Sequence, residues 1–248
     1  MKNEPFNEPY YKELIGLGYL PYNYSEKHYI FVKGDKILKI ARSDYDSAIL
    51  DESYYVERKA HEILISNGLS VAKVLRIYEK GELVNNFTAL EEEKAEGQVF
   101  YNKNSDKNII KSILAFMENA TQIKSNRFGM MGVNGEAKFS SWKEYLLSVI
   151  AKSNCEDKEY FELGLNKIPD VTQASFVITD CNTANFVFEN GKLKCALDVE
   201  RPLWGDKNFL YGIIKARNPY MFGLVENRIK SKGEIIDFYS KIYNLIFK

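Results

Sequence analysis

Short apolar runs and one amphipathic stretch alternate through the first third of the chain. Four runs have the composition of strands: Tyr29–Val32, Ile37–Ala41, Val71–Tyr78 and Asn86–Leu90. Gly34-Asp35 separates the first two runs, and such a pair is typical of a tight hairpin turn. Apolar positions recur with helical spacing over 51–67, and Asn67-Gly68 is a plausible helix stop. The pattern therefore predicts the order strand, strand, helix, strand, strand.

Beyond Gly97 the pattern becomes mainly helical. Helical spacing recurs over four segments: 108–124, 141–151, 156–167 and 226–247. Ser141 precedes Glu144 by three positions, which is the spacing of an N-terminal helix cap. A β-rich island interrupts the helices, with a run over Ala174–Thr179 and a hairpin predicted around Asn190-Gly191. Its two strands are expected over Asn185–Glu189 and Lys194–Asp198.

These elements predict a two-lobed α+β fold, with a small β-rich N-terminal lobe and a larger, mainly helical C-terminal lobe. We expect the first lobe to span 1–91, a short acidic hinge to span 92–97, and the helical lobe to span 98–248. A cleft between two lobes is a common ligand site, and we expect the site there.

Composition excludes several classes of protein. The 248 residues include 34 Lys and Arg against 34 Asp and Glu, and 45% are hydrophobic. A disordered chain would be less apolar, and a dedicated nucleic-acid binder would carry a basic excess. No apolar run approaches the roughly 18 residues of a membrane span, and no secretory signal is evident. We therefore expect a cytoplasmic protein without nucleic-acid or membrane partners; its oligomeric state is not readable.

The three cysteines and two histidines do not suggest a metal site. Cys155, Cys181 and Cys195 lack CxxC spacing, which argues against zinc and favours reduced thiols. Cys181 has no histidine beside it in sequence, so we interpret it as a spacer rather than a nucleophile.

The β-rich island carries the most informative polar residues. Asp180 precedes Asn185 by five positions, and Asp198 follows at the end of the next predicted strand. Phosphoryl transfer from a nucleotide needs one carboxylate to orient the acceptor hydroxyl. It also needs an amide oxygen and a second carboxylate to hold Mg²⁺, which prefers hard oxygen ligands. Turn chemistry alone is the alternative reading for Asp180, and a strand-end charge for Asp198.

In order and spacing, the segment 176–206 resembles the aminoglycoside phosphotransferase and choline kinase-like family, whose members are small-molecule relatives of protein kinases. The resemblance implies a protein-kinase-like fold. It also implies transfer of the γ-phosphate of ATP or GTP to a hydroxyl of an aminoglycoside, a choline-like amino alcohol or a sugar. It makes Asp180 the catalytic residue and makes Asn185 and Asp198 the Mg²⁺ ligands.

The resemblance extends over roughly 15–215 and assigns further residues. Lys39 takes the place of the strand lysine that contacts the phosphates, and Glu57 that of the helix glutamate that pairs with it. Backbone groups near Glu93 and Ala95 would receive the adenine. Glu200 is a candidate carboxylate for the acceptor. Alone, Lys39 or Glu57 would be read as a solvated surface charge.

Two departures from the family pattern leave an alternative open. Ile178-Thr179 replaces the usual His-Gly, and no glycine cluster lies between Tyr22 and Lys27, where backbone N–H groups of 25–27 could cradle phosphate. The alternative is a catalytically weak or inactive module that binds a nucleotide or a metabolite.

Other charged residues receive ordinary interpretations. We interpret Glu91–Lys94 as a solvated charge run and Asp206 as a buttress of the loop. A cationic acceptor would call for an acidic pocket, but we interpret the acidic cluster in 156–162 as a solvated helix face.

Overall fold

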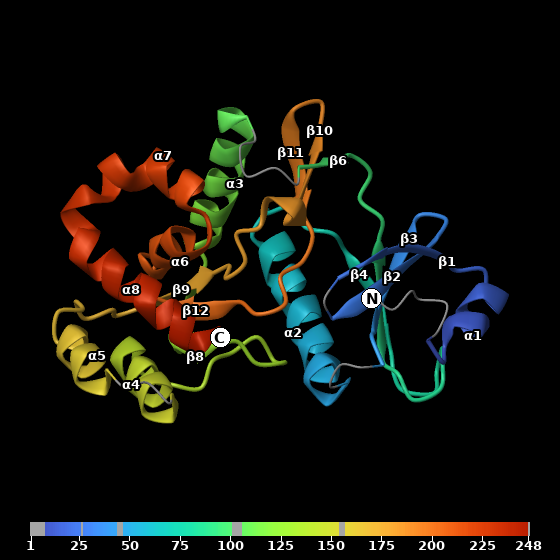
Figure 1. The fold of residues 1–248 in the computed structure, drawn as a ribbon, viewed down its shortest axis with the longest axis horizontal. Coiled ribbons are helices and arrows are strands. Elements are labelled where there is room, and N and C mark those ends of the chain that lie inside the picture. Colours follow the sequence, from blue (N-terminus) through green and yellow to red (C-terminus); the bar gives the residue numbers. More distant parts are fainter. Residues whose placement is uncertain (1–7, 26, 44–46, 101–105, 154–156, 248) are drawn as a thin grey trace.

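A five-stranded antiparallel sheet forms the N-terminal lobe of the computed structural model, which describes residues 8–25, 27–43, 47–100, 106–153 and 157–247. Its order is β1-β2-β3-β5-β4. The strands are β1 (Leu20–Tyr24), β2 (His28–Lys33), β3 (Lys36–Ala41), β4 (Val74–Tyr78) and β5 (Ala89–Glu93). The short helix α1 (Tyr11–Gly16) lies at the outer end of this lobe (Figure 1).

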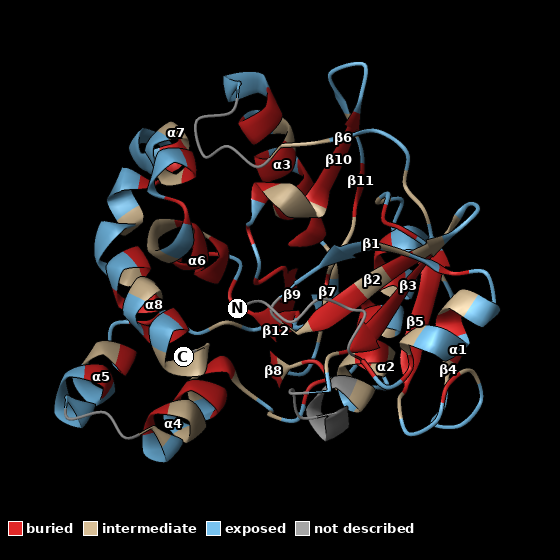
Figure 2. Cartoon of the chain, turned by 45° about the vertical axis from the view of Figure 1, so that its right-hand side comes forward, coloured by how far each residue is buried: buried red, intermediate tan, exposed pale blue. Residues whose placement is uncertain are grey.

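The predicted hairpin between β2 and β3 is confirmed. Lys33 pairs with Lys36, so Gly34-Asp35 forms a two-residue turn. Gly34 has a φ of 59°, in the left-handed region that glycine enters without steric cost. Buried residues dominate β3 and β5 (Figure 2), because apolar clusters cover both faces of the sheet.

Helix α2 (Ser47–Ser66) links the two lobes. Its Tyr54 packs with Ile77 and Leu90 against the sheet. Its Val56, Ala60 and Leu64 belong to the large core of the helical lobe. In Figure 1 the helix lies between the sheet and the helices. One amphipathic helix therefore fixes how the sheet meets the rest of the chain.

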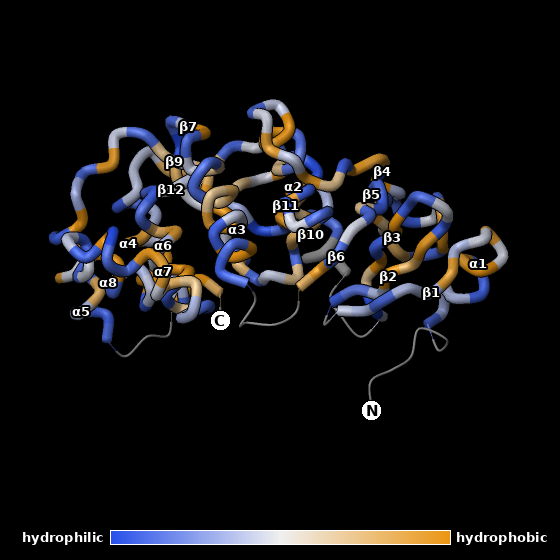
Figure 3. The backbone as a smooth tube through the Cα atoms, turned by 90° about the horizontal axis from the view of Figure 1, so that it is seen from above, coloured by the Kyte–Doolittle hydropathy of each residue, from blue (hydrophilic) through white to orange (hydrophobic). Residues whose placement is uncertain are grey.

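The C-terminal lobe is mainly helical, and apolar positions recur along its helices (Figure 3). Its helices are α3 (Lys107–Ala120), α4 (Trp142–Lys152), α5 (Lys158–Leu165), α6 (Phe209–Arg217), α7 (Pro219–Ile229) and α8 (Gly233–Ile246). Ser141 caps α4 as predicted, since its hydroxyl accepts the N–H of Glu144 at 3.2 Å. The two-lobed α+β prediction is confirmed.

Short strands support the loops of this lobe. β10 (Phe186–Glu189) and β11 (Lys192–Ala196) form the predicted hairpin, with Asn190 and Gly191 at φ of 51° and 75°. β6 (Gln98–Val99) extends this hairpin to three strands. A second small sheet has the order β7-β9-β12-β8 and contains β7 (Lys124–Ser125), β8 (Gly129–Met130), β9 (Ala174–Val177) and β12 (Leu203–Gly205).

Several elements differ from the prediction: β4 begins at Val74 rather than Val71, and β1 was not predicted. β5 begins three residues later than expected, because Asn86 has a φ of 64° and cannot continue an extended strand. β5 ends at Glu93. The expected boundaries of the lobes and of the hinge remain a prediction. The helix expected over 226–247 is two helices, α7 and α8, joined by a 3₁₀ turn over Lys230–Lys232. Among the described helices, none is both long enough and apolar enough to cross a membrane.

Close packing between α6 and α8 makes Gly212 sensitive to substitution. A Cβ at this position would lie 2.5 Å from Cβ of Tyr239 and 2.9 Å from the backbone nitrogen of Ser240. We expect Gly212→Ala to lower the free energy of unfolding by about 2 kcal/mol, because backbone atoms cannot yield as a flexible side chain can.

The matched control is Gly223→Ala in α7, where no atom lies within 4 Å of the added methyl group. It should leave stability unchanged or raise it by about 0.5 kcal/mol. Urea unfolding of both variants measures the difference, and equal effects would contradict the packing argument.

Candidate functional site

A buried lysine joins three elements of the N-terminal lobe. Lys39 on β3 is 7% exposed, and its Nζ lies 2.7 Å from Oε1 of Glu57 on α2. The same Nζ lies 3.4 Å from Oε2 of Glu92 on β5. The structure thus brings together Lys39 and Glu57, as the sequence predicted, and adds Glu92 as a second partner.

The carboxylates around Lys39 keep it charged. Burial alone would lower the pKa of Lys39, but Glu57, Glu92 and Asp198 raise it well above its usual value. Burial raises the pKa of Glu57, and the neighbouring ammonium group opposes that effect. Lys39 therefore stays protonated, and its positive charge stabilises the ionised carboxylates around it.

His61 stands one helical turn after Glu57 and connects α2 to the segment before β4. Its Nδ1 lies 2.6 Å from the carbonyl oxygen of Ala72, so Nδ1 carries the proton and donates. Its Nε2 lies 3.8 Å from Oε1 of Glu57. Burial and the charge of Lys39 lower the pKa of His61 to about 4, so the ring is neutral near pH 7. The contact between Glu57 and His61 is therefore one with a neutral ring.

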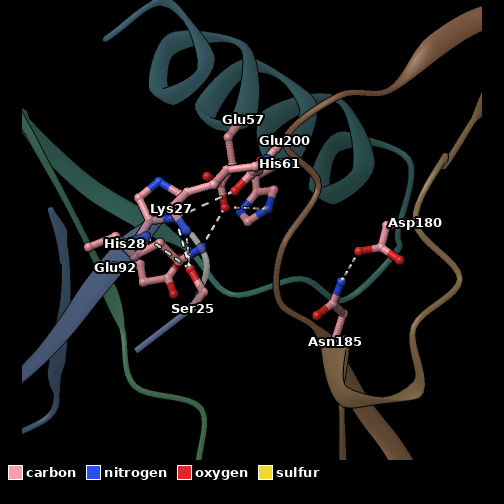
Figure 4. A network of polar contacts seen from close by, with 10 residues as sticks. Ser25, Lys27, His28, Glu57, His61, Glu92, Asp180, Asn185 and Glu200 are labelled. Carbon is pink, nitrogen blue, oxygen red and sulfur yellow. Dashed lines mark hydrogen bonds and ion pairs between the residues drawn. The ribbon is translucent and has the colours of Figure 1, made fainter. Parts of the chain in front are cut away.

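Hydrogen bonds within the loop after β9 orient Asp180. Its Oδ1 accepts the N–H of Asn182 at 2.9 Å. Its Oδ2 accepts Nδ2 of Asn185 at 3.0 Å (Figure 4). Asn182 in turn accepts the N–H of Ala184 and caps the 3₁₀ turn Thr183–Asn185. Asp180 is exposed, so these contacts fix its direction without closing it from solvent.

Thr179 anchors the loop in the place where the family carries glycine. Its Oγ1 donates to the carbonyl oxygen of Arg201 at 2.7 Å, and Tyr243 donates to the carbonyl oxygen of Thr179 at 3.5 Å. Ile178 is 3% exposed and belongs to the large core. The loop is thus tied to the segment after Asp198 without a histidine, a role that the sequence did not reveal.

Asp198 follows β11 and carries an unsatisfied buried oxygen. Its Oδ1 has no hydrogen-bond partner among the described residues. Burial raises its pKa to about 7, although Lys39 opposes the shift. Because Nδ2 of Asn185 points to Asp180, Oδ1 of Asn185 is its remaining polar atom.

These two side chains fit a magnesium ion that takes its other ligands from phosphate and water. In the described part of the chain, no group of three or more His, Cys, Asp or Glu side chains is arranged to hold a metal by itself.

Glu200 is paired with a lysine from the other lobe. Nζ of Lys27 lies 2.6 Å from Oε2 of Glu200, and Nδ1 of His28 lies 3.7 Å from Oε1. Burial would raise the pKa of Glu200, but the ion pair with Lys27 lowers it. Burial lowers the pKa of His28 to about 4, so Lys27 carries the balancing charge. Glu200, the carboxylate expected to bind the acceptor, is therefore ionised, and Lys27 already compensates its charge.

The turn between β1 and β2 is built on a serine instead of glycines. Oγ of Ser25 accepts the N–H groups of Lys27 and His28 at 3.3 and 3.0 Å. Glu26, within the expected phosphate cradle, lies outside the described residues. The turn also brings the ammonium group of Lys27 to Glu200. The sequence pointed only to the backbone of Lys27.

One pocket of about 510 Å³ unites most of the predicted site. Asp180, Asn185, Asp198 and Glu200 line it together with Ser25 and Lys27. Its remaining lining residues are Ile178, Thr179, Asn182, Val199, Arg201, Pro202, Arg217, Tyr243 and Phe247. Lys39 and Glu57 do not line the pocket, although the charge of Lys39 acts on the pKa of Asp198.

The residues expected near the adenine lie elsewhere. Glu93 ends β5, and its N–H donates to the carbonyl oxygen of Lys73 at 2.9 Å. Ala95 follows on the connecting segment, and neither residue lines the pocket. Their role in binding adenine remains a prediction.

The interpretation of Glu91–Lys94 as a solvated charge run was wrong. Glu91 and Glu92 are 3% and 4% exposed, since they lie on β5, an interior strand between β3 and β4. Glu91 accepts the hydroxyl of Tyr19 at 2.5 Å and pairs with Lys36 at 3.1 Å. Buried carboxylates keep such partners because desolvation of a lone charge is costly.

Asp206 and the cysteines have structural roles in the described residues. Asp206 accepts hydrogen bonds from Asn208 and Tyr239, as expected of a buttress. Burial raises the pKa of Cys181 to about 12, which makes its thiol a poor nucleophile. Cys181 and Cys195 are free thiols, whereas Cys155 and Glu156 lie outside the described residues.

No protein-family model matches the sequence, and no curated protein matches it by sequence. The structure, however, is similar to the crystal structure of aminoglycoside phosphotransferase APH(4)-Ia. The TM-score is 0.74 at 16% identity, over 92% of this chain and 83% of that chain. This is the fold of the aminoglycoside phosphotransferases. The resemblance predicted from the sequence is thus confirmed for the fold.

Two other small-molecule kinases have similar structures. A fructosamine-3-kinase-like protein from Haemophilus somnus 129PT has a TM-score of 0.60 at 17% identity, over 95% of this chain and 87% of that chain. The amicoumacin kinase hAmiN has a TM-score of 0.50 at 16% identity, over 91% of this chain and 72% of that chain. Identity this low establishes the fold alone.

The buried neutral ring of His61 should make stability depend on pH. Its pKa is lowered from 6.5 to about 4, so the unfolded chain binds more protons between these values. Its contribution to stability is complete above pH 6.5 and is lost as the pH falls towards 4.

We expect His61→Asn, which keeps a donor for Ala72, to flatten this dependence by up to about 1.4 kcal/mol per pH unit. Urea unfolding at several pH values between 4.5 and 7 tests this. Ile65→Asn, at an exposed position of the same helix, introduces the same residue without removing or adding a titratable group and serves as the control. Parallel curves for wild type and His61→Asn would refute the argument.

Proposed function

We propose that the chain is a small-molecule kinase that transfers the γ-phosphate of ATP or GTP to a hydroxyl group. The observation that carries the proposal is the shared pocket, in which Asp180, Asn185 and Asp198 meet from two separate segments. The similarity to known phosphotransferases supports it. A related structure contains the nucleotide analogue AMP-PNP together with hygromycin B, which is a statement about that protein.

In this proposal Lys39 contacts the α- and β-phosphates. Glu57 and Glu92 hold its ammonium group in place, so its charge needs no reorganisation when the nucleotide enters. Backbone groups near Glu93 and Ala95 receive the adenine. The β1–β2 turn, with Ser25 and Lys27, lies against the phosphates.

Asn185 and Asp198 would hold Mg²⁺, which, when bound, neutralises charge on the phosphates. Asp180 orients the acceptor hydroxyl and takes its proton as the oxygen attacks the γ-phosphorus. The bond from the γ-phosphorus to the β,γ-bridging oxygen breaks, and the nucleoside diphosphate leaves. The hydrogen bonds from Asn182 and Asn185 keep Asp180 aimed at that oxygen.

A kinase-like module that binds without catalysis is the second candidate. The serine-based β1–β2 turn favours it, because it lacks the glycines of a phosphate loop. The bond from Thr179 to Arg201 favours catalysis, because it fixes the loop that carries Asp180. Binding of Mg-ATP or Mg-GTP without turnover against a broad acceptor panel would support the module.

Removal of the catalytic carboxylate tests the kinase directly. We expect Asp180→Ala to lower turnover by about 10²- to 10⁴-fold, since general-base assistance is lost. Thermal shift with Mg-ATP should remain close to that of wild type. Asp170→Ala, at an exposed surface ion pair, is the control. Phosphorylation by Asp180→Ala at the wild-type rate would remove Asp180 from the mechanism.

Asp198→Ala should weaken binding of the magnesium nucleotide by about tenfold or more, because one of two proposed metal ligands is lost. Titration calorimetry with AMP-PNP at several Mg²⁺ concentrations measures it. Binding of AMP-PNP without metal should change little. If the Mg²⁺ dependence is the same in both proteins, Asp198 does not hold the ion.

A further inference from the structure

We propose, on the basis of the proposed kinase function, that the acceptor is a hydroxylated anion. Such a molecule carries an oxyanion, either a carboxylate or a phosphate ester, beside the hydroxyl that receives the phosphoryl group. Two arginines and an aromatic wall at one end of the pocket define this preference.

Arg217 is an uncommitted cation in the pocket wall. It ends α6, is exposed, and forms no hydrogen bond or ion pair with another described side chain. Its charge counteracts the effect of burial on the pKa of Cys181 and of Tyr243. Because Cys181 follows Asp180 directly, the guanidinium lies beside the loop that presents the proposed base.

Arg201 supplies a second guanidinium on the same wall. It lies over the ring of Phe247, 4.7 Å from the centroid, and this ring stacks on Tyr243 at 4.8 Å. Stacking on an aromatic face leaves the edge of a guanidinium free to donate, and that edge matches the geometry of carboxylate and phosphate. The hydrogen bond from Thr179 to its carbonyl oxygen fixes its backbone relative to the loop.

The carboxylates of the pocket are already engaged. Both oxygens of Asp180 accept hydrogen bonds, and Glu200 is paired with Lys27. Asp198 lies beside Lys39 and is the proposed metal ligand. Among the described lining residues there is no further carboxylate, and the acidic positions of α5 do not line the pocket.

A polycation would therefore face two like charges in this pocket without a free carboxylate to receive it. An oxyanion would meet two guanidinium groups, and its hydroxyl would remain available to Asp180. Like-charge contact excludes a wrong partner as effectively as a good contact selects the right one.

The test uses acceptors that share one skeleton and differ in charge. Glucuronate, glucose and glucosamine form one set, and glycerate, glycerol and 2-amino-1,3-propanediol form a second. Glucose 6-phosphate and glycerol 3-phosphate separate a phosphate ester from a carboxylate. Binding to the full chain with Mg²⁺ and AMP-PNP is measured by calorimetry, and phosphoryl transfer is measured with ATP and GTP.

We expect the anion of at least one set to bind about tenfold more tightly than its neutral and cationic partners, which corresponds to one charge-assisted hydrogen bond. Arg217→Glu should remove this preference and favour the cation, and Arg201→Gln should weaken binding of the anion. Arg127→Gln, at an exposed arginine away from the pocket, is the matched control and should change nothing.

Equal or tighter binding of the cation or the neutral molecule in both sets would overturn the inference. Unchanged anion binding by Arg217→Glu would do the same. Mg-AMP-PNP binding is followed in every variant to separate the two proposals. Failure of wild type to bind any nucleotide contradicts the kinase, whereas normal nucleotide binding with a preference for cations contradicts only the acceptor class.

Discussion

The buried charge of Lys39 is the constraint on which the arrangement of the site depends. A desolvated ammonium group costs several kcal/mol unless carboxylates compensate it. Its two partners come from α2 and β5, so neither element can move away without exposing an uncompensated charge. Because α2 also contributes Val56, Ala60 and Leu64 to the core of the other lobe, the ion pair helps to set the position of both lobes.

The cost of burying an uncompensated charge also explains why cationic side chains lie beside the carboxylates of this region. Glu57, Glu92 and Asp198 raise the pKa of Lys39, but one ammonium group does not balance three carboxylates. Oδ1 of Asp198 still lacks a hydrogen-bond partner among the described residues. Glu200 is also buried and needs a compensating charge, which Lys27 of the β1–β2 turn supplies through an ion pair. Lys39 and Lys27, which lie on different segments, thus compensate different carboxylates of this region.

The sequence predicted those features that depend on neighbouring residues. The Gly34-Asp35 and Asn190-Gly191 turns, the cap at Ser141 and the helical lobe follow from local patterns. Glu91 and Glu92 resembled a solvated run, because charged residues are rarely buried and their partners lie far away in sequence. The predicted pair of Lys39 and Glu57 came from resemblance to a family. Composition would have left both residues on the surface.

The proposed acceptor end of the pocket could not be predicted from local sequence patterns. Its residues come from the loop after β11 and from the ends of α6 and α8. No spacing rule connects Arg201, Arg217 and Tyr243, which meet only when the helices pack. One fold hosts many functions, and the residues of the site decide which substrate is bound. The formal charge of zero over the whole chain conceals this division. In the proposed function, carboxylates gather where phosphates and metal would bind and guanidinium groups gather where the acceptor would enter, so the local sign of the charge would decide specificity.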